Sequence, residues 1–154
     1  MDLEDLFRSH QRELFAYFLR IVRDAHSAEE LAQETMVRAC GAALRFRGSS
    51  SVRTWLFGIA HRVLLEASRA GLFEKFDSVD EDRPAEARGL SPGERVDLER
   101  ALATMRPGDR ETLVMVDMLG FEPIEVAAMQ GISPDTFRVR LHRARGRLRE
   151  AYGQ

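Results

Sequence analysis

The last third of the chain, residues 122–152, reads EPIEVAAMQGISPDTFRVRLHRARGRLREAY and decides how we interpret the rest. Its pattern predicts a short helix, a tight turn over residues 131–133 and a longer helix. Ser133 is placed to cap the second helix, Pro134 suits its first position, and Asp135 complements its dipole. We therefore expect a helix-turn-helix.

The second helix of this motif has two distinct faces. At 100° per residue, one narrow arc is apolar and should be buried: Phe137, Leu141, Ala144 and Leu148. The opposite arc points outward: Asp135, Val139, His142 and Gly146. Arginines line both of its sides: Arg138, Arg145 and Arg149 on one, Arg140, Arg143 and Arg147 on the other. A solvated basic face is the simpler explanation. The capped turn and the two-sided arrangement favour DNA binding in a major groove, with a phosphate strand on either side.

The bulk composition limits the alternatives. A formal charge of −2 argues against a protein that coats nucleic acid non-specifically, so DNA binding must rest on local patches or on a partner. The single cysteine, Cys40, excludes an internal disulfide and fits a reducing cytosol. No apolar run approaches the ~20 residues of a membrane span, and no signal peptide is evident. We expect a cytoplasmic protein without membrane insertion.

No catalytic chemistry is indicated. The four histidines (His10, His26, His61 and His142) lack carboxylates or cysteines at ligand spacing, and no phosphate-binding glycine loop or nucleophile elbow occurs. We expect no catalytic residue, no metal and no cofactor, and therefore no enzyme.

The first half of the chain predicts three helices. The first spans residues 2–22, and the second starts at Ser27, which forms a capping box with Glu30. A glycine and three serines make residues 46–51 a loop. A third helix over residues 52–69 should carry an outward basic side: Arg53, His61, Arg62 and Arg69. Trp55 is either a core residue or, beside this loop, a platform for single-stranded DNA.

The predicted fold class is all-α, with two small helical domains joined by an acidic flexible linker. We expect the domains at residues 1–70 and 91–154, and the linker at residues 71–90. Tethering of the two domains is a sufficient explanation for the linker, and mimicry of nucleic acid by its acidic residues is an additional possibility. Ser91 should open the second domain as a capping box with Glu94, and a further helix is expected from Asp109 to residue 119.

Taken together, these stretches resemble the sigma-70 family of bacterial transcription initiation factors, in its extracytoplasmic-function (ECF) type. AEELAQETMVRA (residues 28–39) and RFRGSSSVRTWLFGIAHRVLLE (residues 45–66) look like the family's region 2. GFEPIEVAAMQGISPDTFRVRLHRARGRL (residues 120–148) is similar to its region 4. The resemblance covers nearly the whole chain outside the linker, with the motifs in the family's order.

The resemblance implies partners and roles. Core RNA polymerase would be bound at its β′ coiled coil by Glu30, Leu31, Gln33, Glu34 and Arg38, and at its β flap by the second domain. The melted −10 promoter element would be held by Phe46, Arg47, Gly48, Ser49, Ser50, Ser51, Arg53, Trp55, His61 and Arg62. The −35 element would be read by Ser133, Asp135, Thr136, Arg138, Val139, His142, Arg143 and Arg147. A cognate anti-sigma factor is a further implied partner.

Two other functions compete with promoter-directed transcription initiation. The chain could be a stand-alone helix-turn-helix regulator, or a sigma-like decoy that binds an anti-sigma factor but no promoter. The loop at residues 46–51 and the acidic linker argue against the regulator, which needs neither. The intact arginine array of the last helix argues against the decoy.

Overall fold

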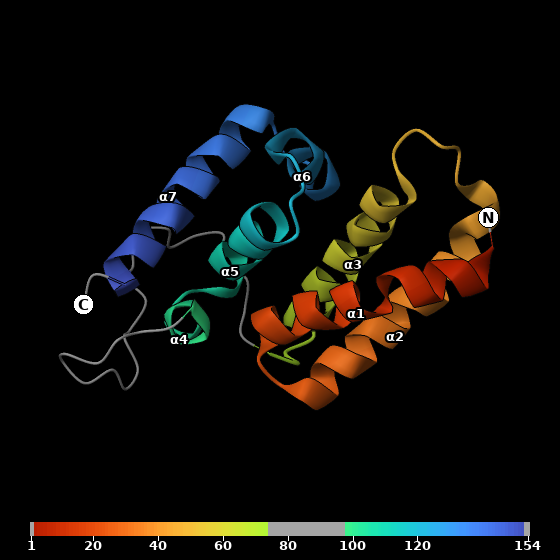
Figure 1. Cartoon of the computed structure of the whole chain (residues 1–154), viewed down its shortest axis with the longest axis horizontal. Helices are drawn as coiled ribbons and strands as arrows, with labels where there is room; N and C mark the ends of the chain where they lie inside the picture. Colours follow the sequence, from red (N-terminus) through yellow and green to blue (C-terminus); the bar gives the residue numbers. More distant parts are fainter. Residues whose placement is uncertain (1, 74–97, 153–154) are drawn as a thin grey trace.

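The computed structural model describes residues 2–73 and 98–152, and all regular structure in these two ranges is helical (Figure 1). The N-terminal half (residues 2–73) contains α1 (Leu3–Val22), α2 (Ala25–Ala42), the short 3₁₀ helix η1 (Ala43–Arg45) and α3 (Val52–Arg69). The C-terminal half (residues 98–152) contains α4 (Leu98–Ala103), α5 (Pro107–Leu113), η2 (Val114–Met118), α6 (Pro123–Gln130) and α7 (Pro134–Tyr152). The predicted all-α class is confirmed.

The hairpin of α1 and α2 turns at two adjacent residues. Arg23 adopts the left-handed conformation (φ 60°) and ends α1, and the side chain of Asp24 accepts a hydrogen bond from the Ser27 amide. Asp24 therefore caps α2, and the predicted cap at Ser27 is wrong by one turn. The Asp24 carboxylate forms the cap of α2 because, besides the Ser27 amide, it accepts a hydrogen bond from the Ser27 hydroxyl, at 2.7 Å.

The loop at residues 46–51 and the helix that follows it agree with the prediction. The Ser51 hydroxyl oxygen accepts a hydrogen bond from the Thr54 amide at 3.0 Å and so begins α3. Gly48 lies in the loop with φ +72°, a conformation that favours glycine. Residues 74–97, which include most of the predicted linker (residues 71–90) and the capping box predicted at Ser91, lie outside the described residues. The proposed domain boundaries remain a prediction.

The single helix predicted from Asp109 has a different form. It begins earlier, at Pro107, whose fixed φ suits a first helical turn. After Leu113 it widens into the π-helical turn η2, in which the Leu119 amide bonds to the Val114 carbonyl at 2.8 Å. This wide turn leaves the Leu119 carbonyl oriented toward α3.

The helix-turn-helix forms as predicted. Gly131 ends α6 in the left-handed conformation (φ 69°), and Ser133 accepts a hydrogen bond from the Thr136 amide at 3.1 Å. Phe137, Leu141 and Ala144 are buried.

The two halves are packed against each other. One hydrophobic cluster joins residues of α1, α2 and α3 to residues of η2, α6 and α7, and a second, smaller cluster lies within the C-terminal half. In Figure 1, α6 lies beside α3, while α7 lies on the outer side of the molecule, away from α1 and α2. Residues of the two predicted helical domains therefore share a core.

Candidate nucleic-acid interface

The outward face of α7 is accessible along its first two turns. Seven of the eight residues predicted to contact the −35 element are exposed: Ser133, Asp135, Thr136, Arg138, Val139, His142 and Arg143. Val139 has 51% of its surface exposed although it is apolar, and Phe137 and Leu141 hold the opposite side of the helix in the core. We call these seven residues the reading face.

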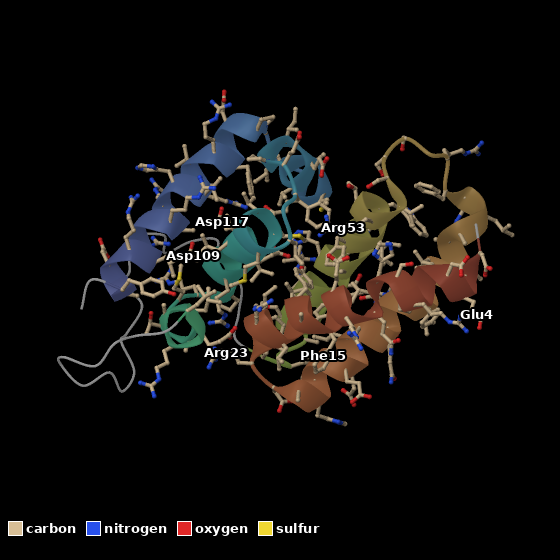
Figure 2. All side chains as sticks on the ribbon, viewed as in Figure 1. Glu4, Phe15, Arg23, Arg53, Asp109 and Asp117 are labelled. Carbon is tan, nitrogen blue, oxygen red and sulfur yellow. The ribbon has the colours of Figure 1, made fainter. Side chains whose placement is uncertain are left out.

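Arg147 does not share this face. Its side chain is 25% exposed and its Nη1 atom lies 2.6 Å from Oδ2 of Asp109 on α5. Arg145 is likewise tied to Asp117, at 2.7 Å, and this hydrogen bond raises the pKa of Arg145. Asp109 and Asp117 lie between α5 and α7 in Figure 2. Two of the six arginines therefore hold α7 against the rest of the C-terminal half. Arg138 instead pairs with Asp135 on the same helix at 3.1 Å, and 75% of its side chain is exposed.

The loop before α3 presents polar backbone beside an aromatic pair. Arg47, Gly48 and the three serines Ser49, Ser50 and Ser51 are exposed. The rings of Phe46 and Trp55 lie 5.0 Å apart at 42°, and both side chains are half-buried. Trp55 is thus neither a fully buried core residue nor a free surface residue. Its ring packs against the core on one side and remains partly accessible on the other.

His61 departs from the predicted outward position. It is 6% exposed, and its Nδ1 atom lies 2.8 and 3.0 Å from the two carboxylate oxygens of Glu111. The helical pattern placed His61 on the polar side of α3, and that side is covered by the C-terminal half. Arg62, the next residue, is exposed.

Arg53 is also engaged by the C-terminal half. Its guanidinium bonds to Glu13 on α1 at 2.7 Å and to the Leu119 carbonyl at 2.5 Å. It lies 4.2 Å from the centre of the Phe121 ring, within the range of a cation–π contact. Burial raises the pKa of Glu13, but the hydrogen bonds from Arg53 and His10 outweigh it and lower the pKa overall. Figure 2 shows Arg53 where α3 meets the C-terminal half.

The polymerase-facing prediction for α2 falls on an accessible helix surface. Glu30, Gln33 and Glu34 are exposed, and Leu31 is half-buried against the core. Arg38 bonds to Glu34 at 2.9 Å and to Glu66 on α3 at 2.5 Å, and these bonds raise its pKa. Arg38 therefore fixes α2 on α3, while Glu30, Gln33 and Glu34 remain exposed on the helix surface.

Glu111 and Gln130 are the residues that sequence reasoning missed. Glu111 is 1% exposed and accepts hydrogen bonds from the Tyr17 hydroxyl, from His61 and from Gln130 (3.0 Å). A charged residue just before the apolar run LVMV was the available signal. Burying a carboxylate is costly unless several hydrogen-bond donors satisfy it. A carboxylate beside an apolar run therefore indicates that polar side chains from other helices surround Glu111.

Neither a metal site nor a membrane span is found in the described ranges. Residues 2–73 and 98–152 contain no group of three histidine, cysteine or carboxylate side chains able to hold a metal ion. None of the described helices combines the length and the apolar character that crossing a bilayer requires.

Comparison with known proteins agrees with this geometry. The model for Sigma-70 region 2 matches residues 6–71, and the model for Sigma-70, region 4 matches residues 95–148. The chain belongs to the sigma-70 family. The two matches occupy most of its length and come in the order that the sequence motifs indicated.

The relatives are RNA polymerase sigma factors of several bacteria, and some of them are of the ECF type. SigC of Mycobacterium tuberculosis, an ECF RNA polymerase sigma factor, is 31% identical, in a match that covers 95% of this chain and 80% of the relative. CarQ of Myxococcus xanthus is 30% identical, covering 98% and 89%. YlaC of Bacillus subtilis is 27% identical, covering 96% and 90%. This chain is a sigma factor of the ECF type, the class that directs RNA polymerase to chosen promoters.

Solved structures share the fold of the described residues. The sigma factor RpoE in complex with the anti-sigma factor NepR from Bartonella quintana gives a TM-score of 0.73 at 24% identity, covering 96% of this chain and 94% of that one. CnrH in complex with the cytosolic domain of CnrY gives 0.68 at 23% identity, covering 96% and 85%. Each match includes both halves.

Proposed function

We propose that this sigma factor binds core RNA polymerase through α2 and reads a promoter at two places, with the loop and start of α3 at the −10 element and with α7 at the −35 element. The observation that carries the proposal is the reading face of α7. It is exposed along two turns, it begins at a capped N-terminus, and residues 6–71 of the same chain match the family's region 2.

Polymerase binding is assigned to the accessible side of α2, residues Glu30, Leu31, Gln33, Glu34 and Arg38. This side offers carboxylate and amide groups on a rigid helix that Arg38 fixes to α3. The β′ coiled coil is the proposed partner of α2, and the β flap that of the C-terminal half.

The −10 assignment rests on the loop and the aromatic pair. The half-buried rings of Phe46 and Trp55 offer a surface on which an unstacked base can pack. The exposed serine hydroxyls and loop amides offer hydrogen bonds to its edge. Arg47 and Arg62 are exposed on the same half and are the proposed phosphate contacts.

Regulation by a cognate anti-sigma factor is part of the proposal. RpoE and CnrH, which share the fold of this chain, are each described in complex with such a factor. We propose that the protein works in the cytoplasm, where RNA polymerase acts, as a transcription regulator without catalytic activity of its own.

The test is transcription from genomic DNA by core RNA polymerase with and without the purified chain. We expect new transcripts that start at a small set of promoters sharing −10 and −35 sequences. A matched pair of variants tests the α2 assignment: Gln33→Arg should lose polymerase binding, and Gln11→Arg, the same change at an exposed site on α1, should keep it.

Two outcomes would favour the competing functions. Tight, specific duplex binding by the free chain with no new transcripts would indicate a stand-alone regulator. Binding to an anti-sigma factor with neither DNA binding nor transcripts would indicate a decoy.

A further inference from the structure

Val139 interrupts the polar reading face of α7 with an apolar side chain. It has 51% of its surface exposed, while Phe137 and Leu141 hold the opposite side of the helix in the core. Its neighbours one turn away along the helix are all polar and exposed: Asp135, Thr136, His142 and Arg143. Because the core lies on the other side of α7, packing within the chain does not account for an apolar residue at this position.

The outward arc of α7 carries short side chains along its middle. Val139 extends only as far as its two γ-methyl groups, and β-branching leaves it essentially one rotamer in a helix. Gly146, two turns further on, has no side chain. The long side chains of Arg138 and Arg143 lie on opposite sides of this arc. A major groove that admits the helix can therefore bring base edges into contact with Val139.

The major groove offers an apolar side chain one kind of partner. Guanine and adenine present polar atoms there, cytosine presents its amino group, and thymine presents a methyl group on C5. Val139 can neither donate nor accept a hydrogen bond. At the other bases it would displace water from polar atoms without replacing the lost hydrogen bonds, which is unfavourable. A valine on the reading face therefore selects for a methyl group.

We propose that Val139 reads a pyrimidine C5-methyl group in the −35 element, so that thymine is preferred at one position. The inference rests on the proposed function, because it assigns the chemistry of one contact within the −35 interface. Arg138 is the adjacent residue, and the ~3.8 Å between consecutive Cα atoms is close to the ~3.4 Å rise of a base pair, so the thymine lies within about two base pairs of the pair that Arg138 reads. 5-Methylcytosine carries the same methyl group and can replace thymine at this position.

Modified bases separate the methyl group from the rest of the base pair. A library randomised across the −35 element, transcribed by core polymerase with the purified chain, first identifies the preferred base pairs. At each preferred A·T pair the thymine is then replaced by uracil, by cytosine or by 5-methylcytosine, with the matching base opposite. Uracil is thymine without its methyl group, and 5-methylcytosine is cytosine with one.

Transcription at a limiting concentration of the chain gives the result. At one position we expect about fourfold more transcript from thymine than from uracil, and a similar gain from 5-methylcytosine over cytosine, which is the factor expected for one buried methyl group. Specific transcripts with no preferred A·T pair, or with equal transcription from thymine and uracil at every such pair, would overturn the inference and leave the promoter function intact. A chain that gives no specific transcripts would refute the promoter function itself, and the inference with it.

Variants of the chain assign the methyl effect to Val139. Val139→Ser removes the apolar surface at an exposed position and should abolish the difference between thymine and uracil. Leu72→Ser is the matched control, because Leu72 is also apolar and 69% exposed but lies outside α7, and it should keep the difference. A uracil penalty of the same size in Val139→Ser would overturn the proposal. An equal loss of transcription from all templates in Val139→Ser would also overturn it and would indicate a contact with polymerase.

Discussion

The hydroxyl of Tyr17 on α1 donates a hydrogen bond to Oε2 of Glu111 on α5, although 94 positions separate the two residues in the chain. Both side chains are buried, and the Tyr17 ring also packs edge-on against Phe57 at a centroid distance of 5.5 Å. The contact links the first helix of the N-terminal half to the centre of the C-terminal half. It predicts that the halves unfold together.

Removing the Glu111 carboxylate should destabilise the whole chain. Glu111→Ala leaves the donors of Tyr17, His61 and Gln130 without their acceptor, and each buried polar group left unsatisfied costs about 1–3 kcal/mol. Tyr17→Phe removes one hydrogen bond and should cost about 1 kcal/mol. Urea unfolding followed by circular dichroism measures both. Glu150→Ala, an exposed change on α7, is the control and should leave the midpoint in place. A Glu111→Ala midpoint equal to that of the control would contradict this role of Glu111.

The same contact predicts a pH dependence on the alkaline side. Burial, and then the Glu111 carboxylate, raise the pKa of Tyr17 well above its ordinary value of 10.0. Because the folded pKa is the higher one, the stability contribution of Tyr17 is complete below pH 10 and is lost as the pH rises through the folded pKa. In a Tyr152→Phe variant Tyr17 is the remaining tyrosine. Its absorbance titration should have a midpoint well above 10.0 and coincide with loss of structure. A midpoint near 10.0 in folded protein would refute this burial.

Arg138 and Arg147 should have different effects on promoter choice. Arg138 is exposed on the reading face and can reach guanine O6 and N7, a contact that discriminates by about 1–3 kcal/mol. Arg147 is held by Asp109 and supports the position of α7. Arg138→Ala should therefore relax specificity at one −35 base pair, and Arg147→Ala should weaken all promoters alike. A library randomised across the −35 element, transcribed with core polymerase, separates the two. The same uniform loss in both variants would mean that the reading face is misassigned.

The serine loop should determine preference at the −10 element. Ser51 caps α3, so replacing all three serines would also remove that cap. The double variant Ser49→Ala with Ser50→Ala changes the loop and keeps the cap. We expect altered preference at one or two −10 positions with polymerase binding retained, since α2 is untouched. Selection from a library randomised across the −10 element measures the preference. Lost polymerase binding with unchanged promoter choice would indicate a structural loop.

Local chemistry in the sequence was sufficient to predict most helix ends. The start of α3 after residue 51, the cap at Ser133 and the turn at Gly131 depend on residues close in sequence, so the sequence alone predicts them. The exception, Asp24 in place of Ser27, arose because two capping residues compete at that turn.

The packing of the halves could not be predicted in the same way. His61 and Arg53 are polar residues on a helical face that periodicity assigns to solvent, and their partners are 50 and 66 residues away. A polar contact between distant segments leaves no periodic signal. The exposed reading face was predicted, because it follows from the apolar arc of α7 alone. The covered part of α3 was not.

The two proposed promoter contacts are further apart than the packed chain can span. Elements centred at −10 and −35 are about 25 base pairs apart, roughly 85 Å along straight B-DNA. A compact chain of this length has a diameter of about 40 Å. Simultaneous binding therefore requires the halves to separate.

The most direct test of this account is one distance, measured in the free chain and in a transcribing complex. Gln11 on α1 and Ile124 on α6 are both exposed and belong to different halves, so labels at Gln11→Cys and Ile124→Cys, in a Cys40→Ser background, report their separation. The labelled protein must first support transcription. We predict a single short distance in the free chain and a much longer one after core polymerase and promoter DNA are added. The same short distance in a complex that makes transcripts would contradict the account.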